Sequence, residues 1–284
     1  MSTDVSFETI RYATDGPIAI LSLNRPDKLN AINAEMVKEL GMAMDLAEAD
    51  DSVRVIVLRG EGKAFSAGFD LSMGEDPSGD PSHYQQWLRS ELQKDFDCIM
   101  RFWNSPKPTI AAVHKYCLGS GMEMAVSCDI TISAEGCRFG APEVRFGSGI
   151  VSLILPWVIG SKLAKELLLT GDDRVTPERA LQMGLINRVV PEEDCLETAM
   201  QMARTIAIND RVAVDLTKLS INRSYEIMGM RQALLQSLEL GVVAEATETP
   251  ESKQFNEILE KDGAKAAIAW SEARLLGSSK SESS

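Results

Sequence analysis

Two glycine-containing segments of the chain could bring free backbone N–H groups to a ligand. The first is AFSAGFDL, residues 64–71, and the second is LGSGME, residues 118–123, which leads into a helical pattern. Small residues let the backbone approach a ligand closely, and free N–H groups at a helix start favour negative charge. Two such donors aimed at one point would form an oxyanion hole, although each loop taken alone could simply be a turn.

Glu123 and Glu143 are the side chains best suited to acid–base chemistry. Glu123 falls in the first turn after LGSG, and Glu143 follows Pro142 in a loop after a strand. Two carboxyls in one water-poor pocket have their pKa values pushed apart, so that one acts as acid and the other as base. The alternatives are structural, because Glu123 could complement the helix dipole and Glu143 could be an exposed loop acid.

Other arrangements that could carry chemistry have less support. A Ser/His/Asp triad through His114 is conceivable, but no G-x-S-x-G turn accompanies it. The GEG at residues 60–62 lacks the third glycine of a dinucleotide-binding loop. The five cysteines form no CxxC pair and are accompanied by only two histidines, so we expect reduced thiols and no metal site.

The elements that position these residues alternate between strand and helix. Short β-branched runs at 18–23, 53–58, 109–113, 130–133 and 185–190 predict strands, and apolar spacing at 36–47 and 88–103 predicts helices. Thr176 before Pro177 marks a helix start, and the chain beyond Pro191 is helical in pattern. The alternation predicts an α/β core over residues 1–195, a helical region over 196–276 and a disordered tail over 277–284.

Composition excludes some functions. The chain has 284 residues and a formal net charge of −13, with no basic block. Nucleic-acid or anionic membrane partners would require clustered Lys and Arg, so we expect neither. The N-terminal residues lack the features of a secretory signal, and no apolar run is long enough to span a bilayer, which predicts a cytoplasmic protein.

Four motifs in order resemble the crotonase superfamily, the enoyl-CoA hydratase/isomerase family, over residues 5–260. They are LNRPDKLNAI (23–32), GKAFSAGFDL (62–71), YCLGSGMEMAVSCD (116–129) and FGAPEV (139–144). The resemblance implies a spiral of ββα repeats, with a helical C-terminal region that forms a homotrimer or a dimer of trimers. It also implies an acyl-CoA substrate, with coenzyme A entering as part of the thioester and no metal or redox cofactor.

The resemblance assigns roles to particular residues. The oxyanion hole would consist of the backbone N–H groups of Phe69 and Ser120. The coenzyme A arm would lie along a larger set, which comprises Lys28, Leu29, Ala31, Ala67, Phe69, Asp70, Leu71 and Ser120. Both glutamate positions of the family's hydratases hold glutamate here, so Glu123 would activate a water and Glu143 would deliver a proton to C2. The sequence therefore predicts an enoyl-CoA hydratase.

Other activities of the superfamily stay open at this point. A Δ3-Δ2-enoyl-CoA isomerase needs only one glutamate, and a thioester or β-diketone hydrolase could use His114. A member that binds acyl-CoA without turnover is the fourth alternative, and the two retained glutamates argue against it.

Three segments depart from the family's common pattern. GSGIVSLILPW at residues 147–157 is shorter than usual, and Ile150 and Trp157 there predict an acyl pocket for a bulky or cyclic group. His114-Lys115 replaces an Asn-Gly turn. The chain end also differs, with Phe255 and Lys261 as candidates for contacts with the coenzyme A base and phosphates.

Overall fold

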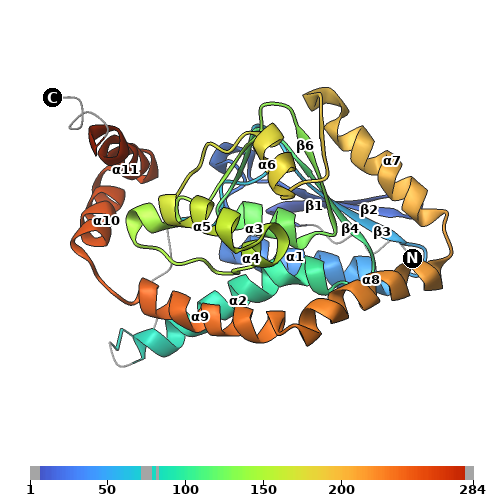
Figure 1. The fold of residues 1–284 in the computed structure, drawn as a ribbon, viewed down its shortest axis with the longest axis horizontal. Coiled ribbons are helices and arrows are strands. Elements are labelled where there is room, and N and C mark those ends of the chain that lie inside the picture. Colours follow the sequence, from blue (N-terminus) through green and yellow to red (C-terminus); the bar gives the residue numbers. More distant parts are fainter. Residues whose placement is uncertain (1–6, 72–78, 81–82, 279–284) are drawn as a thin grey trace.

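A six-stranded sheet forms the centre of the molecule (Figure 1). The computed structural model describes residues 7–71, 79–80 and 83–278. The strand order is β1 (Ile10–Asp15), β2 (Ile18–Leu23), β3 (Val55–Gly60), β4 (Thr109–Val113), β6 (Ile130–Ala134) and β8 (Arg188–Val190). β1 and β2 pair antiparallel, and every later neighbour is parallel. The parallel strands require helical crossovers, which accounts for the alternation seen in the sequence.

A second, two-stranded sheet carries the chain past the glycine loops. β5 (Tyr116–Leu118) pairs in parallel with β7 (Arg138–Gly140). Single bridges extend this layer, joining Ser66 to Cys117 and Phe139 to Val175. The layer therefore brings residues 66–70 beside residues 117–120, which are far apart in sequence.

The two faces of the main sheet bury different sets of helices. Alternate strand residues point to opposite faces. Ile18, Val55, Ile110 and Ile132 pack against α7 (Cys195–Ala207). The strand residues facing the other way pack in a second cluster with α1 (Ala34–Ala49), α2 (Tyr84–Asn104) and α3 (Ser120–Ser127). The helix α3, which begins at the second glycine loop, is buried along its whole length.

The remaining helices surround this core. They are α4 (Leu155–Ile159), α5 (Ser161–Thr170), α6 (Pro177–Met183), α8 (Arg211–Ile227), α9 (Met230–Glu245), α10 (Pro250–Asp262) and α11 (Ala264–Ser278). Three short 3-10 turns complete the elements, at η1 (Pro26–Lys28), η2 (Glu143–Phe146) and η3 (Glu192–Asp194). In Figure 1, α10 and α11 project at the end of the molecule opposite to α7. This mixed α/β fold with C-terminal helices confirms the predicted fold class.

Most predicted elements are confirmed, with differences at their ends. The strands at 18–23 and 109–113 have the predicted bounds, whereas the segment at 185–190 is extended only from residue 188. The Thr176 hydroxyl accepts from the Arg179 N–H at 3.3 Å and begins α6 with Pro177 in its first turn. The helix α11 continues to Ser278, two residues into the predicted tail, and residues 279–284 lie outside the described residues, so the disorder of the tail stays a prediction. The division at residue 195 stays a prediction.

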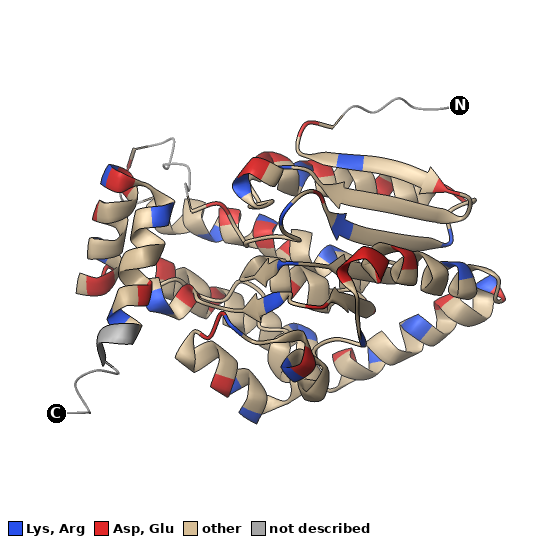
Figure 2. Ribbon diagram, turned by 90° about the horizontal axis from the view of Figure 1, so that it is seen from above, with Lys and Arg blue, Asp and Glu red and all other residues tan. Residues whose placement is uncertain are grey.

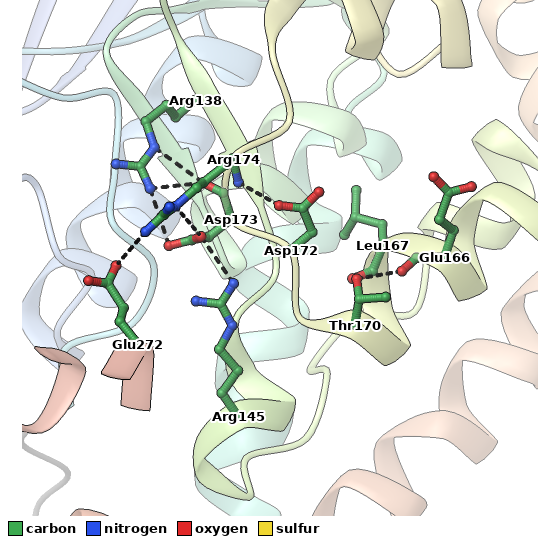
Figure 3. Close-up of polar contacts among 9 residues, drawn as sticks. All are labelled: Arg138, Arg145, Glu166, Leu167, Thr170, Asp172, Asp173, Arg174 and Glu272. Atoms are coloured by element: carbon green, nitrogen blue, oxygen red, sulfur yellow. Dashed lines mark hydrogen bonds and ion pairs between the residues drawn. The ribbon is translucent and has the colours of Figure 1, made fainter. Parts of the chain in front are cut away.

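A buried carboxylate ties the turn η2 to the rest of the fold. Asp173 is 6% exposed and is surrounded by three arginines (Figure 3). Its oxygens lie 3.0 Å from Arg145 of η2 and 3.3 Å from Arg138 of β7. Arg174 adds a longer contact at 3.7 Å and reaches Glu272 of α11. This cluster therefore holds η2 from one side.

Charges of both signs are distributed over the helices (Figure 2). No helix within the described residues has both the length and the apolar character needed to cross a bilayer. The five cysteines are buried and free of disulfides.

Candidate active site

The two glycine loops meet backbone to backbone. Ser66 N–H donates to the Tyr116 carbonyl and Leu118 N–H donates to the Ser66 carbonyl, both at 3.0 Å. A Cβ atom placed on Gly68 would lie 3.3 Å from the Ser120 nitrogen, and Gly68 has a φ of +94°. Only glycine combines this backbone conformation with so close an approach. The fold therefore positions residues 68–69 directly beside residues 119–120.

Two N–H groups at this junction have no acceptor among the described residues. The bridge between Ile32 and Phe69 uses the Gly68 carbonyl and the Asp70 N–H, at 2.9 and 2.8 Å. In such a bridge the N–H of Phe69 itself points away from Ile32. Ser120 opens α3, and the first N–H groups of a helix have no intrahelical partner. The two predicted oxyanion donors are thus adjacent and free to bind a ligand oxygen.

Glu123 lies inside the protein next to these donors. It belongs to α3 and is 3% exposed. Its Oε1 atom accepts a hydrogen bond from the Ser152 N–H at 2.8 Å. Its Oε2 atom is buried without a partner. A buried carboxyl oxygen without a hydrogen-bond partner lowers the stability of the fold. The same free oxygen is needed to bind a water or to accept a proton from the substrate.

Glu143 approaches the same point from η2. A Cβ atom placed on Gly119 would lie 2.5 Å from the Oε1 atom of Glu143. The residue as a whole is half-buried, but its Oε2 atom is inaccessible and has no hydrogen-bond partner. The structure therefore rules out the alternative of an exposed loop acid for Glu143.

Burial makes both carboxyls weak acids. Burial, followed by the charge of Glu143, raises the pKa of Glu123 to about 8. Burial also raises the pKa of Glu143 to about 7, and among the charged neighbours Glu245 adds most to the rise. Groups with pKa values near neutrality both give and take protons readily at physiological pH. The pair is therefore suited to proton transfer rather than to a purely structural role.

A sequence comparison supports the same interpretation. A family model described as Enoyl-CoA hydratase/isomerase matches residues 13–263. The chain belongs to the enoyl-CoA hydratase/isomerase family. The resemblance drawn from the four motifs is thereby confirmed.

Relatives within the enoyl-CoA hydratase/isomerase family cover most of the chain. It is 35% identical over 232 residues to the mitochondrial enoyl-CoA hydratase of Pongo abelii, spanning 80% of this chain and 77% of that protein. It is 34% identical to the short-chain-enoyl-CoA hydratase of Clostridium acetobutylicum, over 75% and 80% of the two chains. The crystal structure of an enoyl-CoA hydratase/isomerase from Xanthobacter autotrophicus Py2 has 43% identity and a TM-score of 0.87, covering 95% of this chain and 99% of that one.

The family's predicted coenzyme A strip is assembled in the structure. Residues 28–32 pair with residues 67–70: Ala67 N–H donates to the Leu29 carbonyl at 3.0 Å, and Ile32 N–H donates to the Gly68 carbonyl. Asp70 forms an ion pair of 2.9 Å with Arg25. The predicted residues of this strip therefore lie along one edge, namely Lys28, Leu29, Ala31, Ala67, Phe69, Asp70 and Leu71. Their contacts with coenzyme A stay a prediction.

The remaining predicted site residues lie outside the coenzyme A strip and the glutamate pair. Ile150 and Trp157 are half-buried against the core, and their part in an acyl pocket stays a prediction. Phe255 is 3% exposed and stacks on Phe146 with ring centroids 4.7 Å apart, and its contact with coenzyme A, like that of Lys261, stays a prediction. The His114 ring lies 3.1 Å from the Gly62 carbonyl and not beside the glutamates.

Two acidic residues near the site escaped the sequence analysis. Asp95 of α2 falls on the apolar spacing of Leu88, Leu92 and Ile99, a signal that could have revealed it. Burial raises the pKa of Asp95 to about 7, and its charge acts on Glu123. Glu245 gave no local signal, because it reaches the site from 97 residues away.

Gly119 provides a first test of the geometry. We expect Gly119→Ala to push the Glu143 carboxyl aside and to lower enoyl-CoA turnover about 100-fold, the usual scale for a displacement of about 1 Å. Gly16→Ala is the control, because Gly16 also has a positive φ, of +55°, but a Cβ atom added there would have no neighbouring atom within 4 Å. Steady-state kinetics of the two variants measures the loss of turnover. Equal losses in Gly119→Ala and Gly16→Ala would contradict the contact between Gly119 and Glu143.

Burial of Glu123 predicts a stability that falls as pH rises. The folded-state pKa of about 8 exceeds the ordinary value of 4.5, so ionising Glu123 costs stability between these pH values. Glu123→Gln removes this cost and should gain a few kcal/mol at about pH 9 but little at about pH 4.5, at roughly 1.4 kcal/mol per pKa unit.

Urea unfolding of both proteins across this pH range measures the difference. Glu35→Gln serves as a control, because the Glu35 side chain is 41% exposed and should not alter the pH dependence. If the unfolding free energies of the wild type and Glu123→Gln change with pH in parallel, ionisation of Glu123 does not lower the stability of the fold.

Proposed function

We propose that the protein is an enoyl-CoA hydratase that adds water across the C2–C3 double bond of a 2-enoyl-CoA thioester. The observation that carries this proposal is the pair of buried carboxyls, each with one unpartnered oxygen, beside two free backbone N–H groups. Relatives named enoyl-CoA hydratases at 34–35% identity support it.

The backbone donors would polarise the thioester. Its carbonyl oxygen would accept hydrogen bonds from the Phe69 and Ser120 N–H groups. As negative charge develops on that oxygen, fixed donors in a water-poor site stabilise it without reorganisation. Withdrawal of electrons through the conjugated double bond leaves C3 electron-poor and open to attack by water.

The two glutamates would then move the protons. The pair holds one proton jointly, because both pKa values lie near neutrality, and the reactive state is the one with this proton on Glu143 and with Glu123 ionised. Glu123 takes a proton from the water, the water oxygen forms a bond to C3, and the C2–C3 π pair moves toward the thioester as an enolate. Glu143 gives its proton to C2, the enolate collapses, and a 3-hydroxyacyl-CoA results. One proton is accepted and one is donated, so the step requires no redox partner.

The alternatives have less support from the site. An isomerase needs a single carboxyl to move a proton between C2 and C4, whereas here a second buried carboxyl keeps a free oxygen. A hydrolase using His114 would need that ring beside the thioester, yet the charged groups that act on it are Glu192, Arg59 and Lys115. The cytoplasm is the predicted compartment, and an acyl group bulkier than a short linear one is the predicted substrate.

We also propose a homotrimer or a dimer of trimers. The helix α8 has no buried residue, and it exposes Val212, Leu216, Leu219 and Ile227. A groove of about 800 Å³ separates it from the core. An apolar helix surface of this kind is typical of an interface between subunits.

Light scattering after size exclusion measures the assembly. We expect three or six times the chain mass of 31.0 kDa. Leu216→Glu places a charge on the exposed face of α8 and should reduce the mass to that of one chain. A wild-type mass of a single chain would contradict the proposed assembly.

The proposed reaction is tested with a panel of 2-enoyl-CoA and 3-enoyl-CoA thioesters bearing short, long, branched and cyclic acyl groups. We expect a gain of one water on 2-enoyl-CoA, read by mass. Glu143→Gln should lower kcat by roughly 10² to 10⁴, the scale of general acid catalysis, with little change in thioester affinity.

Each other product pattern points to another activity. Double-bond migration without a change of mass would identify an isomerase, and free coenzyme A would identify a hydrolase. Near-normal hydration by Glu143→Gln would overturn the assigned role of Glu143, and Glu35→Gln is the matched control for the loss of a surface carboxylate.

A further inference from the structure

The turn that carries Glu143 depends on its neighbours for its position. The turn η2 has only four residues and contributes no buried residue of its own. A catalytic group needs a fixed position, and here other elements must provide it. Arg145 of η2 is held by Asp173 on one side, as Figure 3 shows. The segment on the other side, residues 147–149, contacts α9 and α10.

Glu245, the last residue of α9, binds the backbone that follows η2. Its Oε1 atom accepts from the Gly149 N–H at 2.9 Å and from the Ser148 hydroxyl. Ser148 in turn donates its N–H to the Glu143 carbonyl at 3.1 Å. Ser148 therefore links the Glu245 carboxylate to the Glu143 carbonyl, because its hydroxyl donates to the first and its N–H donates to the second.

Close packing shows that α9 and this segment cannot move independently. A Cβ atom placed on Gly149 would lie 3.0 Å from the Cα atom of Gly241, one turn before Glu245 on α9. On the neighbouring helix α10, Ser252 would lie 2.9 Å from a Cβ atom on Gly147. The loop therefore meets α9 backbone to backbone at Gly241, and it meets α10 at the Ser252 side chain.

We propose that Glu245 is a positioning residue of this site: its carboxylate fixes the backbone after Glu143 and places a negative charge beside that acid. The inference rests on the proposed hydratase function for its kinetic consequences and on geometry alone for the contact itself.

The charge has a definite effect on Glu143. Within the described residues, no Lys or Arg forms an ion pair with Glu245. Its charge raises the pKa of Glu143, second to burial among the raising influences, while Arg145 acts in the opposite direction. The retained proton is the one that Glu143 gives to C2. Glu245 therefore keeps the acid in its donating form to a higher pH.

Within the described residues, other titratable groups also face Glu143 and Glu245. Glu123 faces Glu143 from α3, and Tyr84 faces Glu245 from α2, its pKa raised by burial and then by that charge. Three uncharged residues also contact this turn and its end: Gly171, which follows α5, lies against Val144 and Arg145, and from α10 Phe255 stacks on Phe146 and Ser252 lies against Gly147.

Two substitutions separate the contact from the charge. Glu245→Gln keeps an oxygen acceptor for Ser148 and Gly149 but removes the charge. Hydration should then lose its alkaline activity at a lower pH, by about half a unit to one unit, with kcat at the optimum within about threefold. Glu245→Ala removes both and should also lower kcat about tenfold, with KM nearly unchanged.

Glu239→Gln is the matched control. Glu239 lies on the same helix, its side chain is 53% exposed, and it pairs with Arg89 at 2.7 Å. Its loss removes one carboxylate from α9 without touching η2, so the pH profile should stay in place. A profile that moves equally in Glu239→Gln and Glu245→Gln would overturn the specific role of Glu245.

A double-mutant cycle between Glu245→Gln and Glu143→Gln tests the contact without any activity. The unfolding free energies should show repulsion between the two residues at about pH 9, where Glu143 is ionised, and none at about pH 5, where Glu143 is protonated. Absence of coupling at both pH values would overturn the inference.

The cycle also keeps the two proposals apart. Coupling at about pH 9 in a protein that hydrates no enoyl-CoA would disprove the proposed function and leave the positioning of Glu143 by Glu245 intact. If the protein hydrates enoyl-CoA but Glu245→Gln leaves the pH profile in place and the cycle shows no coupling, the proposed function stands and the role of Glu245 is disproved.

Discussion

The close approach of two backbone segments is the constraint on which the rest of this structure depends. Gly68 lies against Ser120, and a Cβ atom on Gly121 would lie 2.7 Å from that of Ser66. Backbone N–H groups converge on one point only if no side chain separates the segments. The small sheet of β5 and β7 brings the segments together, and the main sheet with α3 behind it holds them there.

A second cost comes from placing two carboxyls at the same point. Each is deprived of water, and the charge of Glu143 raises the energy of ionised Glu123, so the site lowers the stability of the fold that contains it. The compensation is distributed. Ser152 gives Glu123 one hydrogen bond, Asp173 holds the arginine next to Glu143, and the apolar clusters on both faces of the sheet supply the bulk of the favourable burial. The acid pair is therefore locally destabilising, and burial in the large apolar core offsets its cost.

Much of the fold and site followed from the sequence because their signals are local. The strand at 109–113 is apolar from Ile110 onward, and Glu123 and Glu143 stand inside recognisable motifs. The strand β1 was missed because only Ile10 of its six residues is buried, so it lacks a clear alternation. β5 and β7 have three residues each, too few to show a period.

The features that depend on tertiary contacts could not have been found in this way. The position of His114 is decided by the loop at Gly62, and the effect of Glu245 on Glu143 exists only once α9 has packed on η2. Phe255 illustrates the same limit, because the stacking of its ring on Phe146 joins residues that are far apart in sequence and leaves no local signal.

The large sequence separation between η2 and α9 also affects the order in which the site forms during synthesis on the ribosome. Synthesis proceeds from the N-terminus, so the glycine loops, Glu123 and Glu143 emerge before the helix that holds the catalytic turn. Ser148 precedes Glu245 by 97 residues. At translation rates of about 5 to 20 residues per second, the turn waits roughly 5 to 20 s for its partner. The nascent chain thus acquires its donors first and its fully positioned acid only near the end of translation.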